Sequence, residues 1–309
     1  MSGKIIIGVD HGYAAMKTAH CAFPAGLVAY EHEPYTSRDV LEYDGKFFVV
    51  GSGRQPLQKD KTAGENYYLL TLAAIAKELE FRKTDRSVEV ILAAGLPLTS
   101  FGRDKVGFKR YLLRDGRPVS FRYEGRAYEV TVSDVILLPQ GYSAVMTQTD
   151  LLDEPSVIVA DIGGWTVDLM QLDHGIPNAA TCRSLELGVI QCLNEIGEQV
   201  RRSLGLTPSA AQIESVLCSE ANSVDERFKA IAHQEAERYV RRILSAIAEN
   251  GMDARATPTL FLGGGAGLMK RHLSLTSGLC QPVLLDDVTL NAKGYERIVG
   301  QMLDGEADG

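Results

Sequence analysis

Two short stretches of the 309-residue chain place an aspartate at the end of an apolar run and just before glycine. One is Ile5–Lys17, IIIGVDHGYAAMK, and the other is Val157–Leu169, VIVADIGGWTVDL. Backbone N–H groups in a glycine turn can hold phosphate oxygens, and a strand-end carboxylate suits hydrated Mg²⁺, which prefers oxygen ligands and keeps several waters. Asp161 is therefore a candidate magnesium ligand. A plain β-hairpin with Asp161 capping its turn fits the second stretch equally well, because short glycine motifs are weak signals.

The repetition of this pattern about 150 residues apart favours the functional interpretation. Each copy predicts a strand, an Asp-x-Gly turn and a returning strand, so we expect a duplicated architecture with two phosphate-facing hairpins. Lys17 follows Asp10 by seven residues. On a returning strand this spacing aims its ammonium back at the phosphates, although a solvated lysine on a strand face is the commoner case.

A third glycine-rich stretch lies near the C-terminus. The strand predicted at 259–262 opens onto Gly263-Gly264-Gly265-Ala266-Gly267, and a short helix is predicted to begin near Leu268. Glycines there let a flat base or ribose approach the backbone, and a helix N-terminus favours negative charge. A flexible loop is the alternative for a glycine run taken alone.

The elements that must position these residues suggest an α/β protein of two domains. The N-terminal half is predicted to contain a three-stranded meander (5–9, 16–22, 27–30), a polar excursion at 31–61 with one strand at 46–50, helices at 64–81 and 103–113, a strand at 88–94, a hairpin of 119–123 with 127–132, a strand at 136–138 and a helix from Ser143 to about 149. The acidic stretch 150–155 is the predicted linker.

The C-terminal half is predicted to be strand-rich, then helical, then a strand with glycines and a helix. After the hairpin we expect a strand at 176–185, a helical block at about 190–255 containing helices at 189–204, after 207–208 and at 224–249, and then a strand at 282–285 and a helix at 291–303. The predicted domains are 1–150, with an insertion at 31–61, and 151–309, with the helical insertion. The helix at 291–303 is expected to pack back on the first domain.

Composition limits the function classes. Hydrophobic residues make up 45% of the chain and charged residues 23%, as in ordinary globular proteins. A net charge of −8 argues against broad nucleic-acid affinity. Five scattered cysteines without a Cys-x-x-Cys motif are typical of reduced thiols in a cytosolic protein, and the six histidines show no zinc-site spacing. No secretory signal or membrane span is expected, so a cytoplasmic location is predicted.

The glycine-rich stretches resemble, in order, the sequence blocks of the actin-like ATPase superfamily, whose fold is shared by actin, seventy-kilodalton heat-shock chaperones and sugar kinases. Asp10–Lys17 and Asp161–Asp168 resemble the two phosphate blocks, Leu137–Val145 the first connecting block, and Phe261–Lys270 the adenosine block followed by the second connecting block. The resemblance covers essentially the whole chain. It implies an actin-like ATPase fold with two duplicated ribonuclease-H-like halves and inserted subdomains around a nucleotide cleft.

Within the superfamily the chain is most similar to the plasmid-segregation actins of the ParM/StbA type. Its length, Glu186-Leu187-Gly188-Val189 before a helix and Asn291-Ala292-Lys293-Gly294-Tyr295 near the end are the similar features. The resemblance implies an ATPase, with GTP as a possible substitute, that polymerises into filaments and pushes plasmid copies apart. It implies self-association and a DNA-binding adaptor on a plasmid centromere, with no direct nucleic-acid contact.

The resemblance also implies roles for individual residues. Asp10 and Asp161 would hold Mg²⁺ through water, and Lys17 would add positive charge. The implied nucleotide contacts are Asp10, Gly12, Tyr13, Lys17, Gly163, Gly164, Thr166, Gly188, Gly264 and Gly265. Asp168 is expected to be structural, and Trp165 to cover the hairpin or to stack near the nucleotide.

Gln140 and Asp161 are the implied catalytic residues. Gln140 stands where relatives often carry a glutamate. Its amide can orient an attacking water but cannot accept a proton from it, so hydrolysis is expected to be slow until assembly aligns the water. A scaffold that binds nucleotide without hydrolysing it stays open for the same reason.

Two other rival interpretations share the fold. A small-molecule kinase needs a carboxylate base facing the acceptor hydroxyl, and Pro139–Tyr142 offers none. A non-polymerising ATPase also fits the motifs, whereas a peptide-binding chaperone would need a further C-terminal domain.

Overall fold

The computed structural model describes residues 5–53, 60–148, 153–218 and 223–307. The chain forms two compact units. Unit 1 comprises Met1–Gln148 and Thr289–Gly309, and unit 2 comprises Thr149–Val288. The C-terminal segment from Thr289 therefore groups with unit 1, whereas the predicted domain 151–309 includes it, with its helix at 291–303 expected to pack back on the first domain. Part of the predicted linker, 150–152, and the predicted end of the helix at 149 lie outside the described residues.

The described part of unit 1 contains a nine-stranded sheet in the order β3-β2-β1-β7-β9-β8-β5-β6-β4. Its strands β1, β7 and β9 run parallel, and the apolar runs of β1 and β7 are buried on both faces, as expected for parallel strands. The strands are β1 (Ile5–His11), β2 (Ala15–Lys17), β3 (Ala22–Pro24), β4 (Leu27–Tyr30), β5 (Val40–Tyr43), β6 (Lys46–Val50), β7 (Ser87–Leu96), β8 (Val119–Tyr123) and β9 (Arg126–Pro139).

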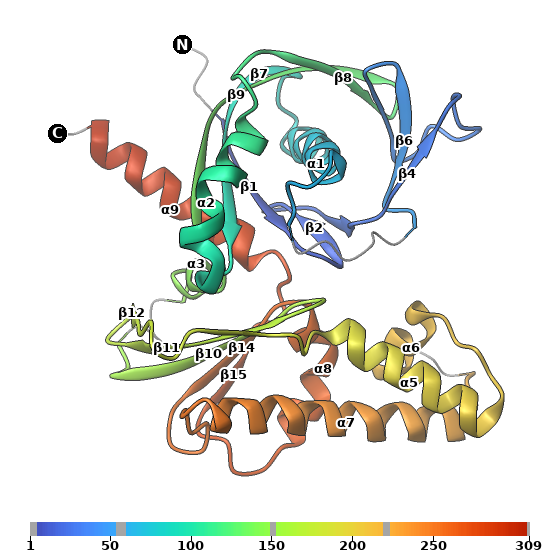
Figure 1. The fold of residues 1–309 in the computed structure, drawn as a ribbon, viewed down its shortest axis with the longest axis vertical. Coiled ribbons are helices and arrows are strands. Elements are labelled where there is room, and N and C mark those ends of the chain that lie inside the picture. The colour runs from blue at the N-terminus through green and yellow to red at the C-terminus, as the bar shows by residue number, and fades with distance from the viewer. Residues whose placement is uncertain (1–4, 54–59, 149–152, 219–222, 308–309) are drawn as a thin grey trace. The chain divides into compact units, whose positions relative to one another are not determined.

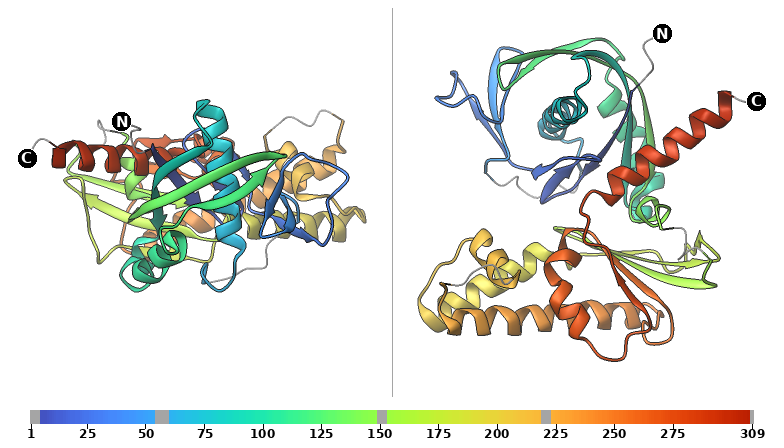
Figure 2. Two further views of the ribbon diagram at one scale, coloured as in Figure 1. Left: turned by 90° about the horizontal axis from the view of Figure 1, so that it is seen from above. Right: turned by 180° about the vertical axis from the view of Figure 1, so that it is seen from behind.

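Helices cover both sides of this sheet. The strands surround α1 (Asn66–Arg82), as Figure 1 shows, and α1 is buried along most of its length. On the outer side, α9 (Leu290–Ala307) packs Tyr295 and Val299 against Ile91 and Ala93 of β7. Both views in Figure 2 show α9 crossing the outside of the sheet. The remaining helices of unit 1 are α2 (Leu98–Leu113) and the single turn α3 (Tyr142–Val145).

Unit 2 has one sheet with helices packed on it. The sheet order is β12-β11-β10-β14-β15, and β13 pairs with β11. Apolar residues of β10 and β11 form a single core with the helices. The strands are β10 (Ser156–Ile162), β11 (Val167–Asp173), β12 (Ile176–Pro177), β13 (Arg183–Leu185), β14 (Thr259–Leu262) and β15 (Pro282–Leu284), and the helices are α5 (Val189–Leu204), α6 (Ala210–Leu217), α7 (Glu226–Glu249) and α8 (Gly264–Leu275).

Several elements of unit 1 differ from the prediction. The predicted three-stranded meander is wrong, because the segment 16–22 is divided between β2 and β3, which pair with each other, and β4 pairs with β6 at the opposite edge of the sheet. The polar excursion contains two strands, because Val40–Tyr43 forms β5 beside β6. The segments predicted as 127–132 and 136–138 are one continuous strand, which pairs with β7 from Glu129 to Pro139 through one register shift. The helix predicted from residue 103 begins at Leu98, directly after Pro97.

Two elements of unit 2 also differ. The strand predicted at 176–185 is interrupted, because a turn at Asn178–Cys182 separates β12 from β13. The helix after the glycine run begins at Gly264 rather than near Leu268, so the glycines form its first turn. Throughout the described ranges, every helix is too short or too polar to cross a lipid bilayer.

Candidate functional site

The hairpin of β1 and β2 brings Asp10 and Lys17 together. Their Cα atoms are directly opposite each other, and Lys17 Nζ lies 2.9 Å from Asp10 Oδ2. The Asp10 side chain is only 2% exposed. A buried carboxylate needs such a partner, because leaving water is costly for an unpaired charge. The structure thus places one carboxylate and one ammonium at the tip of the first hairpin.

The turn between these two strands is tight. A Cβ atom on Gly12 would come within 2.6 Å of the Ala15 carbonyl oxygen and 3.1 Å of Lys17 Nζ. The carbonyl oxygen of His11 accepts a hydrogen bond of 2.5 Å from Lys61 Nζ. That ammonium also lies over the Tyr13 ring, 5.2 Å from its centroid. Lys61 supports the turn, although sequence reasoning missed it because a lysine in a polar segment carries no motif.

His11 lies behind the same turn. Its side chain is fully buried, with Nε2 2.9 Å from Thr71 Oγ1 and the ring edge against Phe108. Burial and, secondarily, the charge of Lys61 lower the pKa of His11 to about 3. The imidazole is therefore neutral at ordinary pH, and the positive charges at this turn come from lysine.

Gln140 follows β9 at the same edge of the sheet as Asp10. The pairs Val9–Ala94 and Leu96–Pro139 align the carboxyl ends of β1, β7 and β9. Ligands of open parallel sheets bind at this edge. The structure therefore brings Gln140 and Asp10 to one edge of unit 1, with the end of β7 between them.

The hairpin of β10 and β11 repeats this arrangement in unit 2. Asp161 stands opposite Asp168, and both side chains are buried. Thr166 Oγ1 donates to Asp168 Oδ2 at 3.3 Å, and the Gly163 N–H donates to the Thr166 carbonyl at 2.8 Å. The structure thus places two buried carboxylates opposite each other at the end of the second hairpin.

The turn of the second hairpin is held by the start of α5. The N–H groups of Gly188, Val189 and Ile190 donate to the carbonyls of Trp165, Gly163 and Gly164, at 2.8, 3.0 and 3.0 Å. A Cβ atom on Gly188 would collide with the backbone of Gly164 and Trp165. The structure therefore places Gly188 beneath the turn, in a packing role.

The glycine run lies beside Asp161. Gly263 has a φ of 88°, and a Cβ atom there would meet Asp161 Oδ1 at 2.5 Å. A Cβ atom on Gly265 would collide with Ile162, so this residue lets α8 pack closely on β10. Gly264 is open, with Val288 Cγ1 at 4.0 Å as its nearest neighbour outside the helix. Gly263 was missed as a site residue, although its position as the first glycine after a strand was a usable signal.

The residues present fit Mg²⁺ and a nucleotide. Each hairpin ends in a buried carboxylate and a tight turn, and the cradle beside Asp161 is one that a Cβ on Gly263 would fill. Within the described residues, no cluster of three or more His, Cys, Asp or Glu side chains is arranged to hold a metal. Magnesium needs only one or two carboxylates when it retains its waters.

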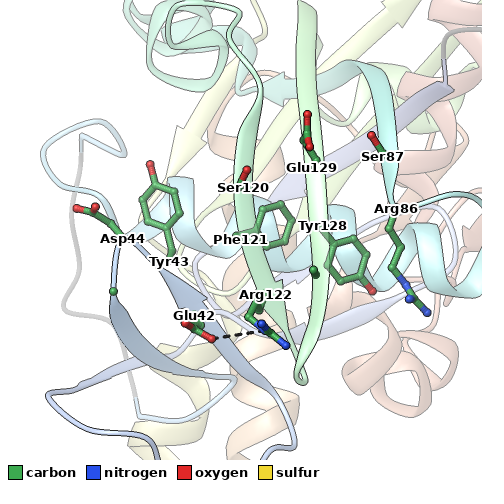
Figure 3. Close-up of a pocket in the computed structure, with 12 residues that line it drawn as sticks. Glu42, Tyr43, Asp44, Arg86, Ser87, Ser120, Phe121, Arg122, Tyr128 and Glu129 are labelled. Carbon is green, nitrogen blue, oxygen red and sulfur yellow. Dashed lines mark ion pairs between the residues drawn. The ribbon is translucent and has the colours of Figure 1, made fainter.

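A separate pocket of unit 1 lies at the other end of the strands that lead to Gln140. It is lined by residues of β5, β7, β8 and β9, including Phe121 and Tyr128, whose rings stack with centroids 5.3 Å apart (Figure 3). Ser87 and Glu129, which also line it, pair at the beginning of β7 and near the beginning of β9. No predicted nucleotide residue lines this pocket.

Family comparisons match both parts of the chain. The model described as "Actin like proteins N terminal domain" matches residues 8–142. The model described as "Archaeal actin homologue MreB-like, C-terminal" matches residues 159–275. These two ranges contain the turns of both hairpins with Asp10 and Asp161, and also Gln140 and the glycine run. Comparison of the sequence with curated proteins finds no match.

Solved structures of similar fold include three informative ones. The archaeal actin homolog Ta0583 superposes with a TM-score of 0.77 at 20% identity, covering 96% of this chain and 99% of its own. The apo psk41 ParM protein gives 0.71 at 17% identity, with 98% and 99% covered. The Alp12 filament structure gives 0.67 at 14% identity, with 97% and 99% covered. The shared fold extends over nearly the full length of all three.

Proposed function

Because this chain belongs to the actin-like superfamily, we propose that it is a nucleotide-dependent, filament-forming ATPase. The observation that carries the proposal is the repeated strand end. In each unit a buried aspartate, Asp10 or Asp161, ends a strand directly before a tight turn that contains glycine. Two independent turns of this kind are more specific than either one alone.

The proposed binding roles follow from where the side chains lie. Asp10 and Asp161 would hold Mg²⁺ through its waters, and the ion would neutralise charge on the phosphates. Backbone N–H groups of Gly12, Tyr13 and the 163–166 turn would hold phosphate oxygens. Lys17, already 2.9 Å from Asp10, supplies positive charge at the first turn.

The proposed site for the base is the start of α8. Gly264 has open space above its Cα, so a flat base or ribose can approach the backbone there. Gly265 packs beneath this surface and Gly188 packs beneath the 163–166 turn, because a Cβ atom on either would collide with its neighbours. They act by allowing close packing around the turn and α8.

The proposed hydrolytic step depends on Gln140. A water oxygen bonds to the γ-phosphorus, the bond from that phosphorus to the oxygen of ADP breaks, and the proton of the water leaves to phosphate or solvent. The Gln140 amide can accept a hydrogen bond from the water and orient it, but it cannot take the proton. Slow basal turnover is therefore expected, with faster turnover once assembly aligns the water.

Filament formation is proposed from the relatives. One structure of similar fold is an Alp12 filament, and others are the archaeal homolog with ADP and Bacillus thuringiensis ParM with ATP. The finer proposal is a cytoplasmic partition protein that assembles with itself and moves plasmid DNA through a DNA-binding adaptor. ATP is the proposed substrate, and GTP is to be tested beside it.

The test is light scattering and pelleting with Mg-ATP, Mg-GTP or no nucleotide, with phosphate release measured in the same samples. Polymer that forms only with nucleotide, followed by phosphate release, is the expected result. Phosphate release without polymer over a wide protein range would refute the filament and favour a non-polymerising ATPase. Polymer without phosphate release would refute the ATPase and favour a nucleotide-binding scaffold.

A further inference from the structure

The turn that carries Gln140 has an unusual backbone. Gly141 has φ 76° and ψ −55°, and the N–H of Tyr142 donates to the Gln140 carbonyl at 2.9 Å. Together these features define a γ-turn with positive φ at its centre, a rare and strained conformation. Strained backbone persists only where its surroundings hold it, and it concentrates at functional sites.

The contact that holds this turn comes from far along the chain. The Gly141 N–H donates to Oδ1 of Asn291 at 2.9 Å, across 150 residues of sequence. Asn291 lies in the first turn of α9, and its side chain is 5% exposed. Gly141 is buried as well. Without the Asn291 oxygen its N–H would lose this partner, and a buried unsatisfied donor is unfavourable.

The backbone on either side of the γ-turn is also fixed. The Gln140 N–H donates to the Leu96 carbonyl at 2.9 Å, and Ser143 Oγ donates to the Pro139 carbonyl at 2.8 Å. The hydrogen bond between Gly141 and Asn291 and the hydrogen bonds to β7 and α3 therefore hold the backbone on both sides of Gln140. Together they set the direction in which the Gln140 side chain leaves the sheet.

The start of α9 is held closely enough to place Asn291 reliably. A Cβ atom on Gly294 would collide with the Ser143 carbonyl, and one on Gly95 would collide with the Tyr295 ring. The helix therefore lies against both α3 and β7 within one turn of Asn291, and Figure 1 shows α3 beside the start of α9. Rigid support of this kind is what a precisely placed polar group requires.

We propose that Asn291 is a positioning residue for nucleotide hydrolysis. By accepting the Gly141 N–H it holds the γ-turn in the conformation that presents the Gln140 amide to the attacking water. The inference rests on the proposed ATPase function. Asn291 itself would touch neither the water nor the phosphate.

The first experiment compares Asn291→Ala with Asn291→Asp, which keeps an oxygen acceptor. We expect Asn291→Ala to lower kcat for phosphate release about 10-fold or more, because small displacements of a positioning group cost large factors in rate. The Kd for ATP should stay within about twofold of wild type, and Asn291→Asp should recover most of the rate. The matched control is Asn250→Ala, which removes a helix-end asparagine of unit 2 bonded to the Ala246 carbonyl at 2.7 Å.

A double-variant cycle separates positioning from general destabilisation. If Asn291 acts through Gln140, adding Asn291→Ala to Gln140→Ala should change kcat by less than about twofold, since interacting residues are not additive. Multiplicative losses in the double variant, or wild-type turnover in Asn291→Ala, would overturn the inference while the ATPase stands. A wild-type protein that binds ATP without releasing phosphate would overturn the proposed activity, and the inference with it.

Discussion

The two hairpins follow one plan but are held in different ways. In unit 1 the turn is held by side chains, since Lys17 pairs with Asp10 and Lys61 donates to the His11 carbonyl. In unit 2 the turn is held by backbone, since the first N–H groups of α5 donate to three consecutive turn carbonyls. The second turn therefore depends on glycine, and the first depends on lysine.

The two copies of the motif in this chain therefore share the aspartate and the tight turn, and they differ in the residues that hold the turn in place. Both copies keep an aspartate at the strand end before a tight turn. The residue opposite that aspartate has opposite character in the two copies, Lys17 in one and Asp168 in the other. The contrast predicts that the two turns share sensitivity to aspartate loss but fail through different supporting residues.

The largest expected effect tests what the hairpins share. Asp10→Ala and Asp161→Ala should each lower Mg-dependent phosphate release by at least about 100-fold, the usual cost of removing a key electrostatic group. Steady-state phosphate release measures this. Asp173→Ala, which changes an aspartate at the far end of the second hairpin, should remain near wild type. If only one of the two variants lost phosphate release, the two aspartates would not have equivalent roles.

The next effect tests the backbone support of the second turn. Gly188→Ala should lower the free energy of unfolding by about 3 kcal/mol, because its Cβ overlaps the turn backbone. Urea titration measures this. Gly197→Ala lies on the same helix, where a Cβ meets only Ile213 Cδ1 at 3.7 Å, and it should stabilise by about 0.5–1 kcal/mol. If the two variants have the same free energy of unfolding, the turn can shift enough to accommodate a Cβ atom on Gly188.

A smaller effect tests the side-chain support of the first turn. Lys17→Met leaves Asp10 buried without its ion-pair partner, so a loss of about 2–3 kcal/mol in the free energy of unfolding is expected, somewhat below the cost at a fully buried pair. The control is Lys270→Met, whose pair with Asp286 is 2.6 Å long but more than half exposed on both sides. That change should cost at most about 1 kcal/mol. Equal losses in the free energy of unfolding would show that the ion pair of Asp10 stabilises the protein no more than an exposed pair does.

The smallest effect concerns the response of a buried histidine of unit 2 to acid. His272 on α8 lies 3.2 Å from His233, and burial, followed by the charge of that neighbour, lowers its pKa to about 4. The unfolded chain takes up this proton near pH 6.5. The contribution of His272 to stability should therefore be full above about pH 6.5, fall as the pH decreases and level off below about pH 4, with a slope of at most about 1.4 kcal/mol per pH unit. His11, with its pKa lowered to about 3, should add a contribution of the same sign.

Urea titrations across this pH range measure the slope. His272→Gln should flatten it by up to one proton, and His32→Gln, at an exposed site, should not. An unchanged slope in His272→Gln would show that the pKa of His272 is the same in the folded protein as in the unfolded chain.

Much of this fold was predictable from local pattern. The apolar runs ending at Asp10 and Asp161 predicted both hairpins, and the structure has them with Lys17 opposite Asp10. The periodic helices at 64–81 and 189–204 also match α1 and α5 closely. The actin-like fold itself is confirmed by the family models. These features depend on neighbours within a few residues, which a sequence displays directly.

The features that were missed depend on packing between distant segments. The glycine run looked like a loop because glycine is a poor helix former, yet close packing of Gly265 on Ile162 makes it the first turn of α8. The close packing of Gly188 beneath the Trp165 backbone likewise appears only in the structure, and its predicted contact with the nucleotide stays a prediction. The Asn291 bond to Gly141 spans 150 residues, and no periodicity or local spacing announces such a contact.

The bond between Asn291 and Gly141 also sets an order of events during synthesis. A ribosome completes Gln140 and Gly141 well before it reaches Asn291, because all of unit 2 is made in between. At about 5–20 residues per second this interval is roughly 7–30 seconds. During that time the nascent first unit lacks α9, which packs Tyr295 and Val299 on the outer face of β7. The γ-turn at Gly141 therefore gains its Asn291 partner only after unit 2 has been made.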